Sequence, residues 1–247
     1  MKRLLTILCL MFAVGCTRST IAQIIQKQII ESHGKSRGYY LFVPDKLTAD
    51  QPAPLLLLLH GSGHNGMSLV EKWKDLAKKE RIILVGPDST NPEMWSTPID
   101  GPDFLHDLIT ELQSKYPIDS HRMYLFGHSA GACFALYMSL YESEFFAATA
   151  IHAGALTAKD KALVAETARK IPIYMVVGTV DRSFPLEAVR ATRDMLNSNG
   201  FSSQLVEMPG HDHWYYDLAP KINVGAWNFL KEQKLAGDPH YTEYSFR

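Results

Sequence analysis

Short runs of apolar residues alternate along this chain with segments whose apolar residues recur at helical spacing. The clearest run, residues 55–59, consists only of leucine and is bounded by Pro54 and Gly61. An uninterrupted run of this length indicates a strand that is buried on both faces. Further strand-like runs follow at residues 82–85, 123–126, 147–151, 173–177 and 204–208.

Helical segments separate these runs. In residues 103–115, Leu105, Leu108, Ile109 and Leu112 form one apolar stripe, which is the spacing of an amphipathic helix. The other segments with helical character are residues 68–79, 130–141, 185–197 and 222–231. Strands that alternate with helices predict a mostly parallel, twisted sheet with helices on both faces.

Two β-rich stretches precede this alternation. Residues 28–32 and 38–43 flank His33-Gly34-Lys35-Ser36 and predict an antiparallel hairpin. We find no linker, internal repeat or low-complexity tract in the rest of the chain, and the segments between strands are too short for a large lid domain. The pattern predicts one α/β domain over residues 28–235, followed by a tail over residues 236–247.

The N-terminus has the pattern of an export signal. Lys2 and Arg3 give it a positive start, and residues 4–14 form an almost unbroken apolar run. This run is too short to cross a bilayer as a helix but has the length of a signal-peptide core. It ends in Ala13-Val14-Gly15-Cys16, which is similar to the bacterial lipobox, whose cysteine becomes the lipidated first residue.

We therefore expect a signal peptide at residues 1–15, a lipid on Cys16 and an N-terminal linker over residues 16–27. The protein would then be exported to the periplasm or the cell surface and would contact the membrane only through its lipid. The alternative is an ordinary secretory signal that is cut near Gly15 or Ala22, with Cys16 incidental.

Composition and charge narrow the functional classes. Of the 247 residues, 46% are hydrophobic, as in an ordinary globular protein. Lys and Arg number 25 against 26 Asp and Glu, so nucleic acid is not an expected partner. The three cysteines, Cys9, Cys16 and Cys133, are too few for a disulfide framework or a structural zinc site.

A serine motif stands between a predicted strand and a predicted helix. Gly127-His128-Ser129-Ala130-Gly131 matches G-x-S-x-G, in which the serine occupies a sharp strand-to-helix turn and the glycines relieve crowding. The turn would hold the Ser129 hydroxyl above the helix N-terminus, whose dipole favours developing negative charge. His128 should point away from this hydroxyl. The alternative is a tight turn in which Ser129 is incidental.

With these residues the chain resembles the α/β-hydrolase superfamily. Residues 116–131 in particular resemble the secreted esterases of the polyhydroxybutyrate-depolymerase and feruloyl-esterase type. The resemblance extends from about the first hairpin to the last helix. It implies an α/β-hydrolase fold, Ser129 as nucleophile, and an acid and a histidine that follow in that order along the chain.

The resemblance also implies positions for the acid and the base. The family's acid follows the strand at residues 173–177, which favours Asp181; its alternative is a solvated aspartate that caps the next helix. Asp160 and Asp194 rank lower because they lie in a charged surface stretch and a helix. The base follows the last strand, where the family's Gly-x-x-His pattern favours His213 over His211.

Two backbone amides are expected to stabilise the oxyanion. The resemblance assigns them to Ala130, directly after the nucleophile, and to Ser62 in the His60-Gly61 loop. His211 is expected to border the substrate or to hydrogen-bond within its loop. Trp95 and Trp214 are expected to border the substrate, although both could equally be core or rim aromatics. No third ligand accompanies His211 and His213, so no metal is expected.

These residues predict a serine hydrolase that cleaves carboxylic esters through an acyl-enzyme and needs no cofactor. The expected substrate is a small-molecule or polysaccharide ester. Two alternatives stay open: a peptidase of the acyl-peptide or dipeptidyl type on the same fold, and a surface-anchored binding module without catalytic activity.

Overall fold

The computed structural model describes residues 24–243 of the chain. The predicted signal peptide at residues 1–15 and the predicted lipidation site Cys16 lie outside the described residues. Most of the linker over residues 16–27 and the end of the tail over residues 236–247 also lie outside them. The signal peptide and the lipid therefore stay predictions.

The predicted hairpin is present and has a tight turn. β1 (Gln26–Ser32) pairs antiparallel with β2 (Lys35–Phe42), and Ser32 lies opposite Lys35. The two turn residues, His33 and Gly34, have φ values of 49° and 72°, as two-residue hairpin turns require. Lys35 and Ser36, which the pattern assigned to the turn, belong to β2.

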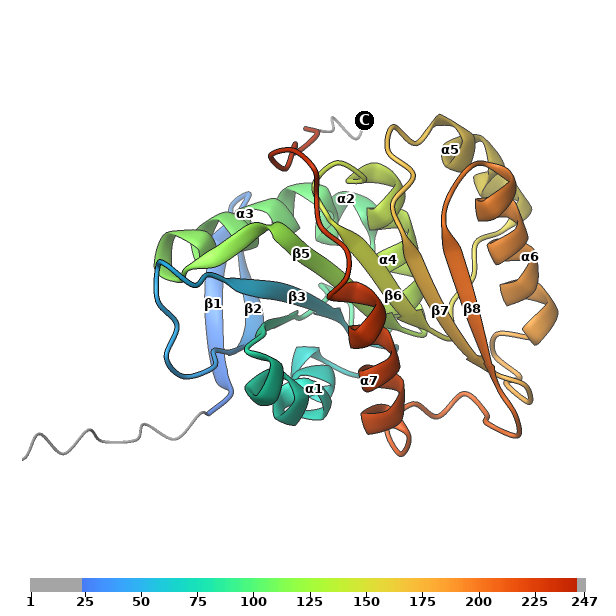
Figure 1. The fold of residues 1–247 in the computed structure, drawn as a ribbon, viewed down its shortest axis with the longest axis horizontal. Helices are drawn as coiled ribbons and strands as arrows, with labels where there is room; N and C mark the ends of the chain where they lie inside the picture. Colours follow the sequence, from blue (N-terminus) through green and yellow to red (C-terminus); the bar gives the residue numbers. More distant parts are fainter. Residues whose placement is uncertain (1–23, 244–247) are drawn as a thin grey trace, which may run out of the picture.

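All strands of the described part form one 8-stranded sheet in the order β1-β2-β4-β3-β5-β6-β7-β8 (Figure 1). The pairs β1–β2 and β2–β4 are antiparallel, and the strands from β4 to β8 are parallel. This confirms the prediction of a mostly parallel sheet. The parallel strands are β4 (Ile83–Pro87), β3 (Ala53–Leu59), β5 (Ile118–His128), β6 (Ala148–His152), β7 (Ile173–Gly178) and β8 (Ser203–Met208).

Helices cover both faces of the sheet (Figure 1). Leu55, Leu57 and Leu59 of β3 pack in one hydrophobic cluster, and Leu56 and Leu58 pack in the other. The first cluster lies under α3 (Pro102–Lys115), α4 (Ala130–Tyr141) and α6 (Leu186–Ser198), and the second under α1 (Gly66–Glu80) and α7 (Ala219–Leu230). Burial of β3 on both faces explains its unbroken leucine run. Among the described residues, no helix combines the length and the apolar character that a membrane crossing requires.

Three short helical segments were not predicted. They are α2 (Thr97–Asp100), a 3-10 turn (Ala158–Asp160) and α5 (Lys161–Glu166). Each is too short to show a periodic apolar stripe, so the hydrophobic pattern has no signal for it.

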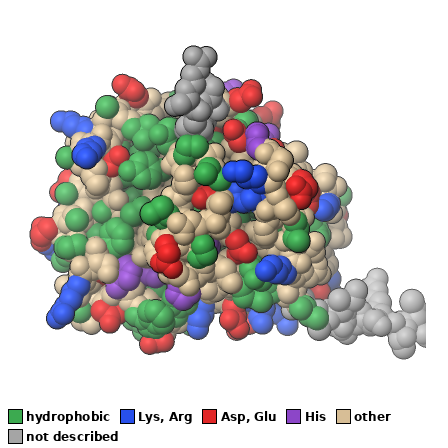
Figure 2. Space-filling view, turned by 180° about the vertical axis from the view of Figure 1, so that it is seen from behind, with side chains coloured by type: hydrophobic (Ala, Val, Ile, Leu, Met, Phe, Trp, Pro, Cys, Tyr) green, Lys and Arg blue, Asp and Glu red, His purple; other side chains and the backbone are tan. Residues whose placement is uncertain are grey.

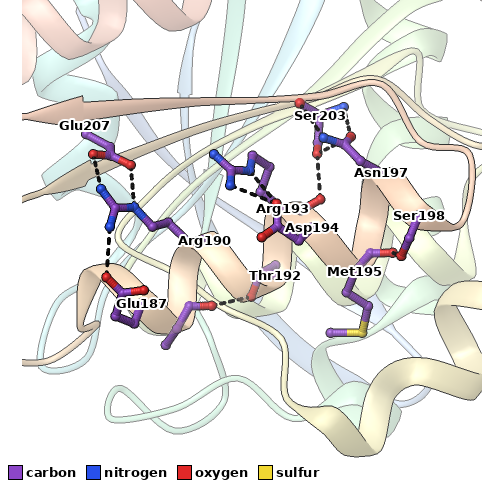
Figure 3. A network of polar contacts seen from close by, with 11 residues as sticks. Glu187, Arg190, Thr192, Arg193, Asp194, Met195, Asn197, Ser198, Ser203 and Glu207 are labelled. Carbon is purple, nitrogen blue, oxygen red and sulfur yellow. Dashed lines mark hydrogen bonds and ion pairs between the residues drawn. The ribbon is translucent and has the colours of Figure 1, made fainter.

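Polar side chains fasten α6 to the edge strand β8 (Figure 3). Arg190 of α6 makes two hydrogen bonds of 2.7 Å to the Glu207 carboxylate of β8. At the other end of the helix, the Ser203 hydroxyl donates to Asn197 Oδ1 at 2.7 Å. These contacts connect α6, which follows the loop that carries Asp181, to β8, which precedes the loop that carries His213.

The chain beyond α7 returns across the domain (Figure 1). The Leu235 N–H donates to the carbonyl oxygen of His121 at 3.0 Å. Further on, the ring of Tyr241 stacks on His106 with a centroid distance of 3.9 Å, and its hydroxyl is hydrogen-bonded to Asp103. Tyr241 in the described part of the tail therefore packs against α3.

Candidate active site

Ser129 occupies the turn between β5 and α4. Its backbone has φ 56° and ψ −120°, a conformation that costs a non-glycine residue about 1–3 kcal/mol. The chain approaches itself closely here: a Cβ atom on Gly131 would lie 2.0 Å from the Leu59 carbonyl oxygen, and one on Gly127 2.2 Å from that of Gly131. Both positions therefore require glycine, and the turn presents Ser129 at the start of α4.

Ser129, His213 and Asp181 form one hydrogen-bonded line. Ser129 Oγ lies 2.9 Å from His213 Nε2, and His213 Nδ1 lies 2.9 Å from Asp181 Oδ2. The Asp181 carboxyl is fully buried, whereas the His213 side chain is 29% exposed. A carboxylate that accepts the Nδ1–H leaves Nε2 free to accept a proton from the serine. The structure thus brings together three residues that the sequence places far apart.

The Asp181 carboxylate is fixed by its own loop. Its Oδ1 accepts the N–H groups of Ser183 at 2.8 Å and Phe184 at 2.9 Å. The Phe184 ring also stacks beside the His213 imidazole with a centroid distance of 5.8 Å. One carboxylate oxygen therefore binds the loop, and the other is directed at His213.

The two lower-ranked aspartates make other contacts. Asp160 accepts hydrogen bonds from the N–H and hydroxyl of Thr157 at 2.7 and 2.8 Å and closes a capping box. Asp194 lies on α6 and pairs with Arg193 at 2.8 Å. Neither one contacts His213.

The loop proposed for the oxyanion lies against Ser129. A Cβ atom on Gly61 would lie 3.3 Å from Ser129 Cβ, so the peptide of the next residue, Ser62, is close to Ser129. Within residues 24–243, the backbone N–H groups of Ser62 and Ala130 donate to no protein acceptor. Both N–H groups are thus available to a developing oxyanion.

His60 and Trp95 support this loop from inside the fold. His60 Nε2 accepts the Ser89 N–H at 3.2 Å, so Nδ1 carries the proton and donates to the Gly61 carbonyl oxygen at 2.9 Å. Burial lowers the pKa of His60, which keeps its ring neutral. The Trp95 indole N–H donates to the His60 carbonyl oxygen at 2.9 Å, and its ring stacks on Phe134 at 4.8 Å. Trp95 has a supporting position here, and its expected contact with the substrate stays a prediction.

A buried ion pair holds the segment that carries Trp95. Arg37 Nη2 lies 2.7 Å from Asp100 Oδ1, and the two side chains are only 6% and 1% exposed. The Asp100 carboxylate also accepts the N–H groups of Thr90 and Ser96, each at 2.9 Å. Sequence reasoning missed this pair because Arg37 belongs to the hairpin and Asp100 follows 63 residues later.

His211 lies inside the fold. It is 8% exposed, and its Nε2 lies 3.1 Å from His152 Nε2. His152 in turn contacts His128, with 3.0 Å between their Nδ1 atoms. This placement corrects the expectation that His211 borders the substrate, because its ring is buried and bonded within the protein. Sequence reasoning gave His152 no role, since nothing local marks a histidine at a strand end.

A groove of about 500 Å³ opens beside His213. Trp214 and Val180 supply apolar surface there and are 50% and 55% exposed. Trp214 thus lies at a groove beside His213, and its contact with a substrate stays a prediction. The residues that line the groove are Val180, Arg182, Ser183, Asp212, His213 and Trp214. On the face opposite to that of Figure 1, histidine side chains reach the surface next to hydrophobic ones (Figure 2).

The donor atoms of the site are directed at one another. In the part of the chain that the structure describes, no group of three or more His, Cys, Asp or Glu side chains could hold a metal ion. The nitrogen atoms of His128, His152 and His211 face each other at hydrogen-bond distance. Ser129, His213 and Asp181 form a separate hydrogen-bonded line. This line can move a proton between the Ser129 hydroxyl and the His213 imidazole.

Two buried histidines make the stability depend on pH. Burial lowers the pKa of His128 to about 3 and that of His152 to about 2. The unfolded chain takes up these protons near pH 6.5 and the folded chain does not, so the stabilising contribution is lost as the pH falls below that value. Between about pH 7.5 and about pH 5, we expect a loss of about 2 kcal/mol in unfolding free energy for each of the two residues. Denaturant titrations at both pH values measure it.

The contribution of Glu142 to the unfolding free energy has the opposite pH dependence, so a variant at this position is a control for the two histidines. Burial raises its pKa to about 7; its Oε2 accepts the Thr242 N–H at 3.2 Å, and its Oε1 has no partner among the described residues. Its contribution is present below its ordinary pKa of 4.5 and is lost as the pH rises through about 7. Glu142→Gln keeps the acceptor for Thr242 and should make the acid-induced loss larger than in the wild type. A smaller loss in this variant would contradict the assignment.

Comparison with known proteins agrees with this fold. A family model described as phospholipase/carboxylesterase matches residues 102–219. Over 223 residues, the chain is 26% identical to a bifunctional acetylxylan esterase/xylanase of Neocallimastix patriciarum. That alignment covers 84% of this chain and 31% of the relative, so the chain spans about a third of that protein's length.

Solved structures with the same fold include named esterases. A thermostable esterase has a TM-score of 0.68 and 23% identity, with 85% of this chain and 63% of that chain covered. A ferulic acid esterase has a TM-score of 0.67 and 15% identity, with 85% and 98% covered. The chain therefore has the α/β-hydrolase fold, as the sequence predicted. The curated relative and both of these structures are named as esterases.

Proposed function

We propose that this α/β-hydrolase is a serine esterase that cleaves carboxylic esters through an acyl-enzyme on Ser129. The observation that carries the proposal is the unbroken line of hydrogen bonds from Asp181 through His213 to Ser129, with 2.9 Å at each contact. A serine hydroxyl becomes a nucleophile when an imidazole takes its proton, and the imidazole needs a carboxylate to fix its tautomer. The line supplies both groups.

In the acylation step, Ser129 Oγ attacks the ester carbonyl carbon and its proton passes to His213 Nε2. The carbonyl oxygen takes the electron pair of the broken π bond and becomes an oxyanion, to which the Ser62 and Ala130 N–H groups donate. The intermediate then collapses. Its bond to the alcohol oxygen breaks, and the alcohol leaves with the proton from His213.

In the deacylation step, a water molecule takes the place of the alcohol. His213 accepts a proton from the water, whose oxygen attacks the acyl carbon. The bond to Ser129 Oγ breaks, Oγ regains the proton from His213, and the carboxylic acid leaves. Asp181 stays ionised throughout and stabilises the imidazolium of His213. These steps need no cofactor.

The groove beside His213 supports an ester with a sizeable acyl or alcohol group. Val180 and Trp214 offer apolar contact, while Arg182 and Asp212 offer hydrogen bonds at the same opening. The related proteins are named for acetylxylan and ferulic acid esters. We therefore propose small-molecule or polysaccharide esters as the substrate class.

Turnover of p-nitrophenyl acetate, compared with that of the matched p-nitroanilide, tests the proposed function. We expect the ester to be hydrolysed faster than the amide, and a fluorophosphonate to label one serine per chain. Faster hydrolysis of the amide would favour the peptidase alternative. A folded protein that is inert towards activated esters and unlabelled would favour a binding module without catalytic activity.

A further inference from the structure

Three buried histidines form a row beneath the reactive side chains. His128, His152 and His211, here called the histidine array, are 4%, 0% and 8% exposed. The Nδ1 atoms of His128 and His152 are 3.0 Å apart, and the Nε2 atoms of His152 and His211 are 3.1 Å apart. The mechanism proposed above uses none of these three rings.

The array connects the two segments that must meet for catalysis. His128 directly precedes Ser129 at the end of β5, and His152 ends the neighbouring strand β6. His211 lies in the loop after β8, two residues before His213. The two hydrogen bonds of the array therefore run from the nucleophile's strand to the loop that carries the proposed base.

Backbone contacts connect the array to the same groups. The Ser129 N–H donates to the His152 carbonyl oxygen at 3.0 Å, and the Val180 N–H donates to the His211 carbonyl oxygen at 3.1 Å. Val180 is the residue before Asp181. The elements that carry all three residues of the hydrogen-bonded line are thus tied to array members.

The two members of the array at the strand ends, His128 and His152, are neutral. Desolvation lowers the pKa of both His128 and His152. Neutral imidazoles at His128 and His152 supply one donor and one acceptor at their contact, and the other ring nitrogen of His152 is bonded to His211. Because the His128 ring centroid lies only 5.1 Å from that of His213, a charged array would repel the imidazolium that forms on His213. Neutral rings at His128 and His152 avoid this repulsion.

We propose that the histidine array positions the loop that carries His213. It holds His213 Nε2 within hydrogen-bond distance of Ser129 Oγ, so that Nε2 can take the proton of the hydroxyl. This inference rests on the proposed function. It assigns His211 and His152 as positioning residues, which act through His213 and do not touch the substrate. The competing explanation is that aromatic packing alone holds the loop, since Tyr215 stacks on His128 with a centroid distance of 5.2 Å.

A matched pair of variants at His211 separates the two explanations. In His211→Gln the amide can occupy the place of Nε2 and bond to His152, whereas His211→Met has a similar length but cannot. We expect His211→Met to lower kcat on p-nitrophenyl acetate by about 10- to 100-fold, because a displacement of about 1 Å in a reacting group can cost that much. KM should change less than about twofold, since the array lies beneath the substrate. His211→Gln should recover most of kcat.

The rate of fluorophosphonate labelling gives a second readout, because it reports the attack by Ser129 without deacylation. It should fall in His211→Met in parallel with kcat. At the other end of the array, His128→Asn and His128→Leu form a second pair, since the asparagine amide can replace Nδ1. This pair decides the question if His211→Met does not fold.

The outcomes are distinct. A wild-type kcat in His211→Met, or equal losses in the glutamine and methionine variants, would overturn the proposal. So would losses of kcat that merely follow a lower folded fraction in thermal unfolding. If the wild type itself neither hydrolyses esters nor reacts with the fluorophosphonate, the proposed function fails, and the array proposal fails with it.

Discussion

Replacing Ser129 with alanine is expected to lower kcat for ester hydrolysis by about 10⁶-fold, as loss of the nucleophile does in other serine hydrolases. Without Oγ, no acyl-enzyme can form, and His213 has no proton to take. The residual rate would come from the oxyanion donors and substrate binding alone. Steady-state kinetics with p-nitrophenyl acetate measure the effect.

Ser198→Ala is the control for this change, because Ser198 is an exposed serine on α6 that bonds only to the Met195 carbonyl oxygen. It should leave kcat unchanged. Alanine has the same Cβ atom as serine, so it adds no strain to a backbone that already has φ 56° at position 129. The variant should therefore stay folded. Undiminished ester turnover by Ser129→Ala would show that another group is the nucleophile.

Asp181→Asn is expected to lower kcat by about 10⁴-fold through the wrong tautomer of His213. Asp181 Oδ1 accepts two backbone N–H groups, from Ser183 and Phe184. The amide oxygen of asparagine must take that place, so its NH₂ group faces His213 Nδ1. That nitrogen then has to accept a hydrogen bond, which leaves the proton on Nε2, where it blocks proton transfer from Ser129.

The pH dependence and a second variant test this reasoning. Asp194→Asn changes an exposed aspartate on α6 that pairs with Arg193, and it should leave kcat unchanged. Because the tautomer in Asp181→Asn is wrong, raising the pH should restore only a small part of the lost rate. A loss of less than about tenfold in Asp181→Asn would argue against a role for Asp181 in orienting His213.

Most elements of the fold could be predicted because their signals are local. The leucine run of β3 reads as a strand buried on both faces, and the predicted helix at residues 130–141 coincides with α4. Its start is marked by a turn that needs glycine at positions 127 and 131. The short helices α2 and α5 carry no such signal, since four to six residues do not complete a periodic stripe.

Only those site residues that a local motif or their order along the chain marks could be predicted from the sequence. Ser129 was predicted from its motif, and Asp181 and His213 from the positions that the resembled family gives its acid and its base. By contrast, the contact of His152 with His211 joins residues 59 positions apart, and that of Arg37 with Asp100 joins residues 63 positions apart. Such pairs depend on how the sheet and its loops pack, and no local pattern encodes them. For the same reason, the sequence did not reveal that the fold buries His211 against His152.

Trapping the acyl group tests the account most directly. The protein is mixed with p-nitrophenyl acetate, quenched in acid during the first turnover, digested and examined by mass spectrometry. The account predicts a burst of nitrophenol and one acetyl group on the peptide that contains Ser129, with none in Ser129→Ala. Steady ester turnover with no acetyl on Ser129, or with an acetyl group on another residue, would contradict it.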